Sequence, residues 1–157
     1  MSVISEIRLA TSDDISQVVA SVTKLFAEDA GMNDPLVDVN WPGHCGFAHY
    51  SSLLSDPACL IMVADVGGSV VGHLVGKMGP PTATRPSTVA VLESLYVDQG
   101  HRRKGLGGDL IDAFLTWSRE QGAVRAVVTS YAANEAAQQT YGHFRFEPQS
   151  VILTLTL

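Results

Sequence analysis

Seven consecutive residues in the second half of the chain could bind an anion through their backbone, because they follow an apolar stretch and begin a segment of helical periodicity. They are Arg102, Arg103, Lys104, Gly105, Leu106, Gly107 and Gly108. N–H groups at a helix start converge on an anion with the help of the helix dipole, and glycine lets a phosphate approach the backbone. The R-x-x-G-x-G spacing differs from the G-x-x-x-x-G-K-[ST] loop of nucleoside-triphosphate sites. The sequence therefore predicts a pyrophosphate cradle of another kind.

Two side chains, one before this turn and one after it, could carry protons. Glu93 is the one acid in the apolar run VAVLESLYV, where burial of a carboxylate is costly unless it is paired or functional. The alternative is a solvent-facing or substrate-facing glutamate that only attracts a cation. Tyr141 lies seven residues after Asn134, so both occupy one helix face after two turns. Ring packing alone could explain the tyrosine, and helix capping alone could explain the asparagine.

Strands and helices that would position these groups follow from the apolar periodicity and the turn residues. We expect strands at Ser5–Leu9, Cys59–Asp65, Ser69–Lys77, Ser87–Val97, Val124–Ser130, Phe144–Phe146 and Val151–Leu157. We expect helices from Ile15 to near Gly31 and at Phe47–Leu54, Gly105–Gln121 and Asn134–Gly142. Thr11 supplies capping chemistry for the first helix, and Gly67-Gly68 a hairpin turn.

This order predicts a mixed α/β (α+β) fold in one domain over residues 1–157. The unit from Ser87 to Ser130 is long enough for a right-handed crossover between two parallel strands. The other strands pair as antiparallel hairpins. We therefore expect a twisted, mostly antiparallel sheet with one parallel strand pair and helices on both faces. Within it, Val124–Ser130 should be a buried strand of the parallel type.

Composition narrows the possible partners. The formal charge of −6 argues against nucleic acid as the main partner. We see no signal peptide and no apolar run of the roughly 20 residues that a membrane span needs, so we expect no membrane partner and a cytoplasmic location. The two cysteines and five histidines show no metal-ligand spacing, so we expect no metal. His73, in the middle of a strand, is interpreted as a hydrogen-bonded structural residue, although it could face a cleft.

Three motifs in this order resemble the GNAT superfamily of acyl-CoA-dependent N-acyltransferases. Arg102–Gly107 fits the [QR]-x-x-G-x-[GA] pyrophosphate motif, and Leu92–Val97 resembles the strand that precedes it. Asn134, Ala137 and Tyr141 fit the N-x-x-A-x-x-x-Y helix that closes the thioester pocket. The likeness covers nearly the whole chain. It implies the GNAT fold, acetyl-CoA as cosubstrate and a primary amine of a small molecule or peptide as acceptor.

The resemblance also implies roles for individual residues. The strand splays from its parallel neighbour, usually at a bulge, and Leu95, Tyr96 and Val97 would contact the cofactor, with the N–H of Leu95 or Val97 holding the oxyanion. Glu93 would take the proton of the amine, directly or through water, and Tyr141 would protonate the leaving thiolate. Asn134 would bond the pantetheine amide. The amine would attack directly in a ternary complex, because no cysteine or serine stands in a nucleophile motif.

Some features leave alternatives open. Arg145 stands where the family usually has glycine, and arginine tolerates positive φ poorly. The family builds its acceptor pocket between the first two helices, which here would place Asp38, Trp41, His44, Phe47 and Tyr50 in it. A homodimer is common in the family, and the terminal strands could pair between subunits. The rival hypothesis is a non-catalytic acyl-CoA-binding regulatory module, which would need the glycine turn but neither Glu93 nor Tyr141.

Overall fold

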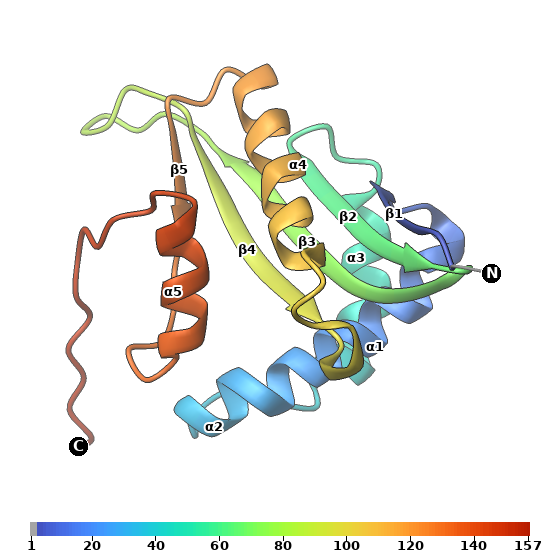
Figure 1. Ribbon diagram of the computed structural model, residues 1–157. Coiled ribbons are helices and arrows are strands. Elements are labelled where there is room, and N and C mark those ends of the chain that lie inside the picture. Colours follow the sequence, from blue (N-terminus) through green and yellow to red (C-terminus); the bar gives the residue numbers. More distant parts are fainter. Residues whose placement is uncertain (1–2) are drawn as a thin grey trace.

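A five-stranded sheet organises residues 3–157, which the computed structural model describes (Figure 1). The strand order in space follows the chain: β1 (Ser5–Leu9), β2 (Cys59–Val66), β3 (Ser69–Gly79), β4 (Val89–Val97) and β5 (Arg125–Val128). The first four strands pair antiparallel, and β4 and β5 are parallel. The predicted mixed sheet with one parallel pair is therefore confirmed.

Helices cover both faces of this sheet. On one face lies α4 (Leu106–Glu120). On the other lie α1 (Ile15–Leu25) and α3 (Phe47–Leu53), and α5 (Glu135–His143) stands beside β5 (Figure 1). α1 continues through a π-helical segment, Phe26–Ala30, into the short α2 (Gly31–Asn33), and a second π-helical segment, Pro42–Gly46, precedes α3. None of the helices in the described part of the chain has the length and apolar character needed to cross a bilayer.

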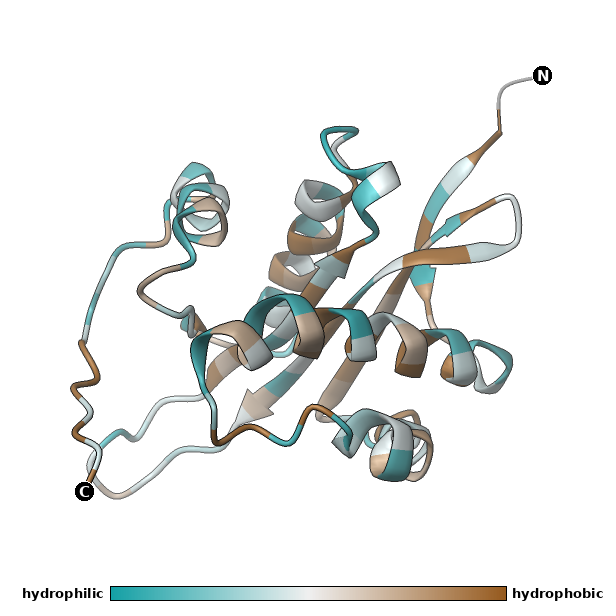
Figure 2. Ribbon diagram, turned by 90° about the horizontal axis from the view of Figure 1, so that it is seen from below, coloured by the Kyte–Doolittle hydropathy of each residue, from teal (hydrophilic) through white to brown (hydrophobic). Residues whose placement is uncertain are grey.

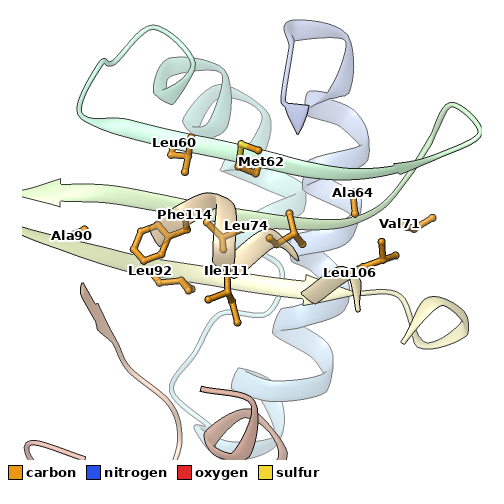
Figure 3. Close-up of a cluster of buried hydrophobic side chains, with 11 residues drawn as sticks. Leu60, Met62, Ala64, Val71, Leu74, Ala90, Leu92, Leu106, Ile111 and Phe114 are labelled. Atoms are coloured by element: carbon orange, nitrogen blue, oxygen red, sulfur yellow. The ribbon is translucent and has the colours of Figure 1, made fainter. Parts of the chain in front are cut away.

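Two apolar clusters, one on each face, hold the layers together. Figure 3 shows the α4 side, where Phe114 and Ile111 lie over Leu74 and Leu92 of the sheet. Phe114 is fully buried, and its ring packs so close to β3 that a Cβ on Gly76 would lie 2.8 Å from it. The cluster on the opposite face is formed by Ile15, Val18, Val22, Tyr50, Ile61, Val63 and Val75. The sheet is thus packed on both faces, and β4 contributes Ala90 and Leu92 to the α4 side.

The end of the chain differs from the prediction. Neither Phe144–Phe146 nor Val151–Leu157 forms a strand, and β5 is a short edge strand of partly exposed residues rather than a long buried one. The N–H groups of Arg145 and Phe146 bond back to the carbonyls of Gly142 and Tyr141, which ends α5 in a turn instead of starting a strand. Arg145 itself adopts the left-handed φ of 67° that the sequence made doubtful. The last seven residues extend away from the sheet (Figure 2).

Candidate active site

β4 continues beyond the end of its parallel partner β5, and a cleft opens there. Their pairing runs from Val89↔Arg125 to Leu92↔Val128 and stops there. On its other edge, β4 pairs Leu92 with Gly76 and Ser94 with Val75, so Glu93 is an extra residue without a partner in β3. Such a β-bulge bends its strand and increases the local twist. The bulge at Glu93 lies at the point where β4 leaves β5.

The cleft has a cavity of about 90 Å³ between β4, β5, α5 and the end of α1. Its lining residues are Leu25, Asp29, Leu92, Glu93, Ser94, Leu95, Val128, Thr129, Ser130, Asn134, Ala137 and Tyr141. The structure therefore brings together four of the residues that the sequence singled out: Glu93, Leu95, Asn134 and Tyr141. Tyr96, Val97 and the glycine turn are not part of this lining. They lie further along β4 and at the start of α4.

The glycine turn has the backbone that an anion cradle requires. Gly105 is the N-cap of α4 with φ = 83°, a conformation that side chains with a Cβ rarely adopt. The next N–H groups, those of Leu106, Gly107 and Gly108, belong to the first turn of α4 and have no carbonyl to bond within the helix. A Cβ on Gly107 would meet only the Val97 side chain, at 3.9 Å. Backbone donors thus gather in an open turn beside the end of β4.

Arg102 makes contacts within the protein that the sequence did not reveal. Its Nε donates to the carbonyl of Val97 at 2.8 Å, and its guanidinium pairs with Glu28 at 2.8 Å. Glu28 also accepts a hydrogen bond from Tyr96 Oη at 2.7 Å. Burial opposes ionisation of Glu28, but the hydrogen bonds from Arg102 and Tyr96 outweigh it and lower its pKa. Arg102 therefore joins the glycine turn to the helical segment after α1, while Arg103 and Lys104 remain exposed.

Glu93 is not buried, which removes the cost that the apolar run suggested. Its side chain is 34% exposed and forms an ion pair of 2.5 Å with Lys77 of β3. This hydrogen bond and the charge of Glu93 raise the pKa of Lys77. On the other side, burial and then the charge of Glu93 raise the pKa of Tyr50 to about 12. The carboxylate thus lies at the cleft, between β3 and α3. The sequence signalled neither neighbour.

Tyr141 projects from α5 into the opposite wall of the cleft. Its ring packs edge-on against Phe146 at 5.7 Å between centroids. Burial, followed by the charge of Asp29, raises its pKa to about 12. The phenol therefore keeps its proton throughout the neutral pH range and can act as a donor.

Asp29 is a site residue that the sequence analysis missed. It lies in the π-helical segment after α1 and accepts a hydrogen bond of 3.0 Å from Asn134 Nδ2. The other end of the Asn134 amide caps α5 by accepting from the N–H of Ala137 at 3.1 Å. Asn134 therefore caps its helix and also ties α5 to the α1 side of the cleft. No motif marks Asp29, because a π-helical turn shifts the apolar periodicity that assigned this helix.

Residues proposed for an acceptor pocket divide into two groups. Trp41 and Tyr50 pack with Phe26 and His49 in one aromatic cluster next to the apolar core. Phe47 is 59% exposed and lies outside this cluster. His44 is also exposed, and Asp38 accepts a hydrogen bond from the N–H of Asn40 in its own loop. Residues 3–157 contain no group of three histidine, cysteine or acidic side chains placed to hold a metal ion.

Comparison with known proteins identifies the family and the fold of this chain. A family model described as the acetyltransferase (GNAT) family matches residues 21–146. The chain resembles a structure of the aminoglycoside N-acetyltransferase AAC(6')-Iy in complex with CoA, with 16% identity, a TM-score of 0.82 and coverage of 100% of this chain and 97% of the other. No curated protein sequence matches the chain.

Two further solved structures share the fold. One is a ribosomal-protein-alanine N-acetyltransferase from Brucella melitensis biovar Abortus 2308, with 17% identity, a TM-score of 0.69 and coverage of 98% of this chain and 100% of the other. The second is a transcriptional regulator from Bacillus halodurans C-125, with 21% identity, a TM-score of 0.76 and coverage of 98% and 100%. Identities this low show a common fold and leave substrate and activity to the site itself.

Proposed function

The chain belongs to the GNAT acetyltransferase family, and from this premise we propose that it transfers an acetyl group from acetyl-CoA to a primary amine. The observation that carries the proposal is the cleft at the β4 bulge. Glu93 and Leu95 line it from β4, and Tyr141 lines it from α5. A carboxylate, a protonated phenol and strand N–H groups are what acyl transfer between a thioester and an amine requires.

The glycine turn would hold the pyrophosphate of the cosubstrate. N–H groups from Arg103 to Gly108 supply donors at the positive end of α4, and the exposed Arg103 and Lys104 add charge. Because only Asp98 and a short 3-10 helix, Gln99–His101, separate β4 from the turn, the remaining arm of the thioester would run back along Val97, Tyr96 and Leu95 into the cleft. Asn134 Nδ2 donates one hydrogen to Asp29, and its second hydrogen would bond an amide carbonyl of that arm.

The reaction would proceed by direct attack in a ternary complex. The amine enters as an ammonium and loses one proton to Glu93, and its freed lone pair attacks the thioester carbonyl. The N–H of Leu95 or Val97 holds the oxyanion, and the nitrogen of the intermediate releases its second proton to water. The C–S bond then breaks, and Tyr141 donates to the departing sulfur. A phenol of pKa about 12 is a weaker acid than a thiol of about 8.5. The proton is therefore shared with sulfur while the bond breaks, rather than transferred beforehand.

A non-catalytic acyl-CoA-binding module is the second candidate, and one fold neighbour is named as a transcriptional regulator. Such a module would use the glycine turn without Glu93 and Tyr141. The test is CoA release from acetyl-CoA on a panel of polyamines, aminoglycosides, amino acids and peptide N-termini, with acetyl-CoA binding measured by calorimetry. Amine-dependent release supports the enzyme. Tight binding without release on the whole panel supports the module.

We also propose that the chain forms a homodimer through its last residues. Val151, Leu153 and Leu155 are between 83% and 89% exposed on a segment, residues 151–157, whose apolar residues alternate with threonines at the end. An exposed segment with the alternation of a strand can pair with an open sheet edge and bury its apolar side chains there. β5 is the last strand of the sheet and has one open edge. Each copy carries one such segment and one such edge. In a dimer, residues 151–157 of each copy would pair with β5 of the other.

A further inference from the structure

A completely buried histidine connects α1 to the cleft. His73 of β3 has no exposed surface, its Nδ1 lies 2.6 Å from Ser21 Oγ on α1, and its Nε2 lies 3.0 Å from Ser94 Oγ on β4. Ser21 is also buried, whereas Ser94 lines the cleft next to Glu93. A line of three polar side chains thus runs from α1 along this face of the sheet to the bulge in β4.

His73 is held in its neutral form by burial between the two serine hydroxyls. Burial lowers the pKa of His73 to about 3, so the imidazole is neutral, with one ring nitrogen donating and the other accepting. The two hydroxyls satisfy both nitrogens, which a buried polar group needs. A hydroxyl has one donor and two acceptor sites, so Ser94 keeps at least one lone pair for a ligand in either tautomer.

We propose that Ser94 binds the acceptor amine in the cleft and that His73, backed by Ser21, is the positioning residue that holds it there. This inference rests on the proposed acetyl transfer. An amine presented to a thioester carbonyl must keep its lone pair on the line of attack, which two fixed acceptors achieve by taking two of its hydrogens. The Glu93 carboxylate is one of these acceptors, and the adjacent Ser94 Oγ is the second.

The bulge explains why Ser94 needs support. The extra residue at Glu93 interrupts the ladder between β3 and β4, so the backbone alone positions this stretch less firmly. Ser94 also has no neighbour in β5, because the parallel pairing stops at Leu92. The bond to His73 replaces the lost restraint. Through His73 and Ser21, Ser94 is linked along this face of the sheet to α1, a helix that packs in the apolar core.

The test compares two variants that keep different halves of the imidazole. In His73→Gln the side-chain amide reaches the position of Nε2 and so can still bond Ser94. In His73→Asn it reaches the position of Nδ1 and can bond only Ser21. Both variants lose a buried ring, and melting temperatures measured for each should fall by similar amounts. The readout is kcat/KM for the amine and KM for acetyl-CoA, with Ser94→Ala as reference.

We expect Ser94→Ala and His73→Asn each to lower kcat/KM for the amine about tenfold, the worth of one hydrogen bond, with KM for acetyl-CoA unchanged. His73→Gln should lose markedly less. In the Ser94→Ala background, His73→Asn should cause no further loss. Equal losses for the two histidine variants, or full activity of Ser94→Ala, overturn the inference while acetyl transfer stands. A wild-type protein that acetylates no amine overturns the proposed function and this inference together.

Discussion

Removal of one oxygen atom from Tyr141 tests the proposed exit of the thiolate. Tyr141→Phe keeps the ring that packs against Phe146 at 5.7 Å and deletes only the phenol hydroxyl. The ring remains part of the cleft wall, so the binding of acetyl-CoA should change little. We therefore expect Tyr141→Phe to lower kcat and to leave KM for acetyl-CoA nearly unchanged.

The size of the loss follows from the state of the phenol. Its pKa of about 12 means that it acts chiefly as a hydrogen-bond donor to a sulfur that gains charge. A hydrogen bond to a charged group is worth about 1.5–3 kcal/mol. At 1.36 kcal/mol for each factor of ten, kcat should fall roughly 10- to 150-fold. Complete proton transfer by a general acid would permit a loss of up to about 10⁴.

Thiol release in the steady state, followed with a chromogenic disulfide, measures kcat from pH 6 to 9. Tyr131→Phe is the matched control. Tyr131 is also a partly buried phenol whose pKa is raised by burial and by the charges of Asp34 and Asp29, but it does not line the cleft. We expect Tyr131→Phe to keep wild-type kcat. An unchanged kcat in Tyr141→Phe would refute the proposed role of the phenol.

Three further predictions concern the turn, the fold and the C-terminus. In Gly105→Ala, the alanine must adopt φ = 83°, a left-handed conformation that costs a residue with a Cβ about 1–2 kcal/mol. We therefore expect the Kd of acetyl-CoA, measured by calorimetry, to rise about tenfold. Gly100→Ala is the control and should leave this Kd unchanged, because Gly100 has ordinary φ and no atom near its Cβ position. The hydrogen bond from Arg8 lowers the pKa of Asp14 from 3.8 to about 2, which stabilises the fold above pH 3.8 and is lost as pH falls through 2. Urea unfolding should show about 2 kcal/mol lost between pH 5 and 2, and Asp14→Asn should lack this loss. In light scattering, the full chain should be a dimer and a chain ending at residue 150 a monomer; a monomeric full chain contradicts the shared strand.

Local constraints explain which parts of the fold the sequence predicted. Gly105 and the Gly67-Gly68 hairpin adopt positive φ, a conformation that glycine favours at a turn between two predicted elements. The helices from Ile15 and Leu106 have apolar faces that persist over several turns. Such signals lie within one segment and need no knowledge of the rest of the chain.

Contacts between distant segments could not be predicted in this way. Ser21 and His73 are 52 positions apart, and Asp29 and Asn134 are 105 apart. The terminal strand prediction is wrong for the same reason, because alternation in residues 151–157 shows that the segment suits a sheet but not which edge is free to receive it. A strand exists only when its partner is in place.

The bulge at Glu93 is one feature whose signal was present in the apolar pattern of β4. Ala90 and Leu92 face α4, as their spacing of two requires, but the next residues packed on that cluster are Leu95 and Val97. The step of three between Leu92 and Leu95 is possible only if one residue is added to the strand between them. The added residue, Glu93, forms the ion pair with Lys77 and lies where the pairing with β5 ends. The proposed base, the cleft and the place of Leu95 in its lining therefore coincide at one break of alternation.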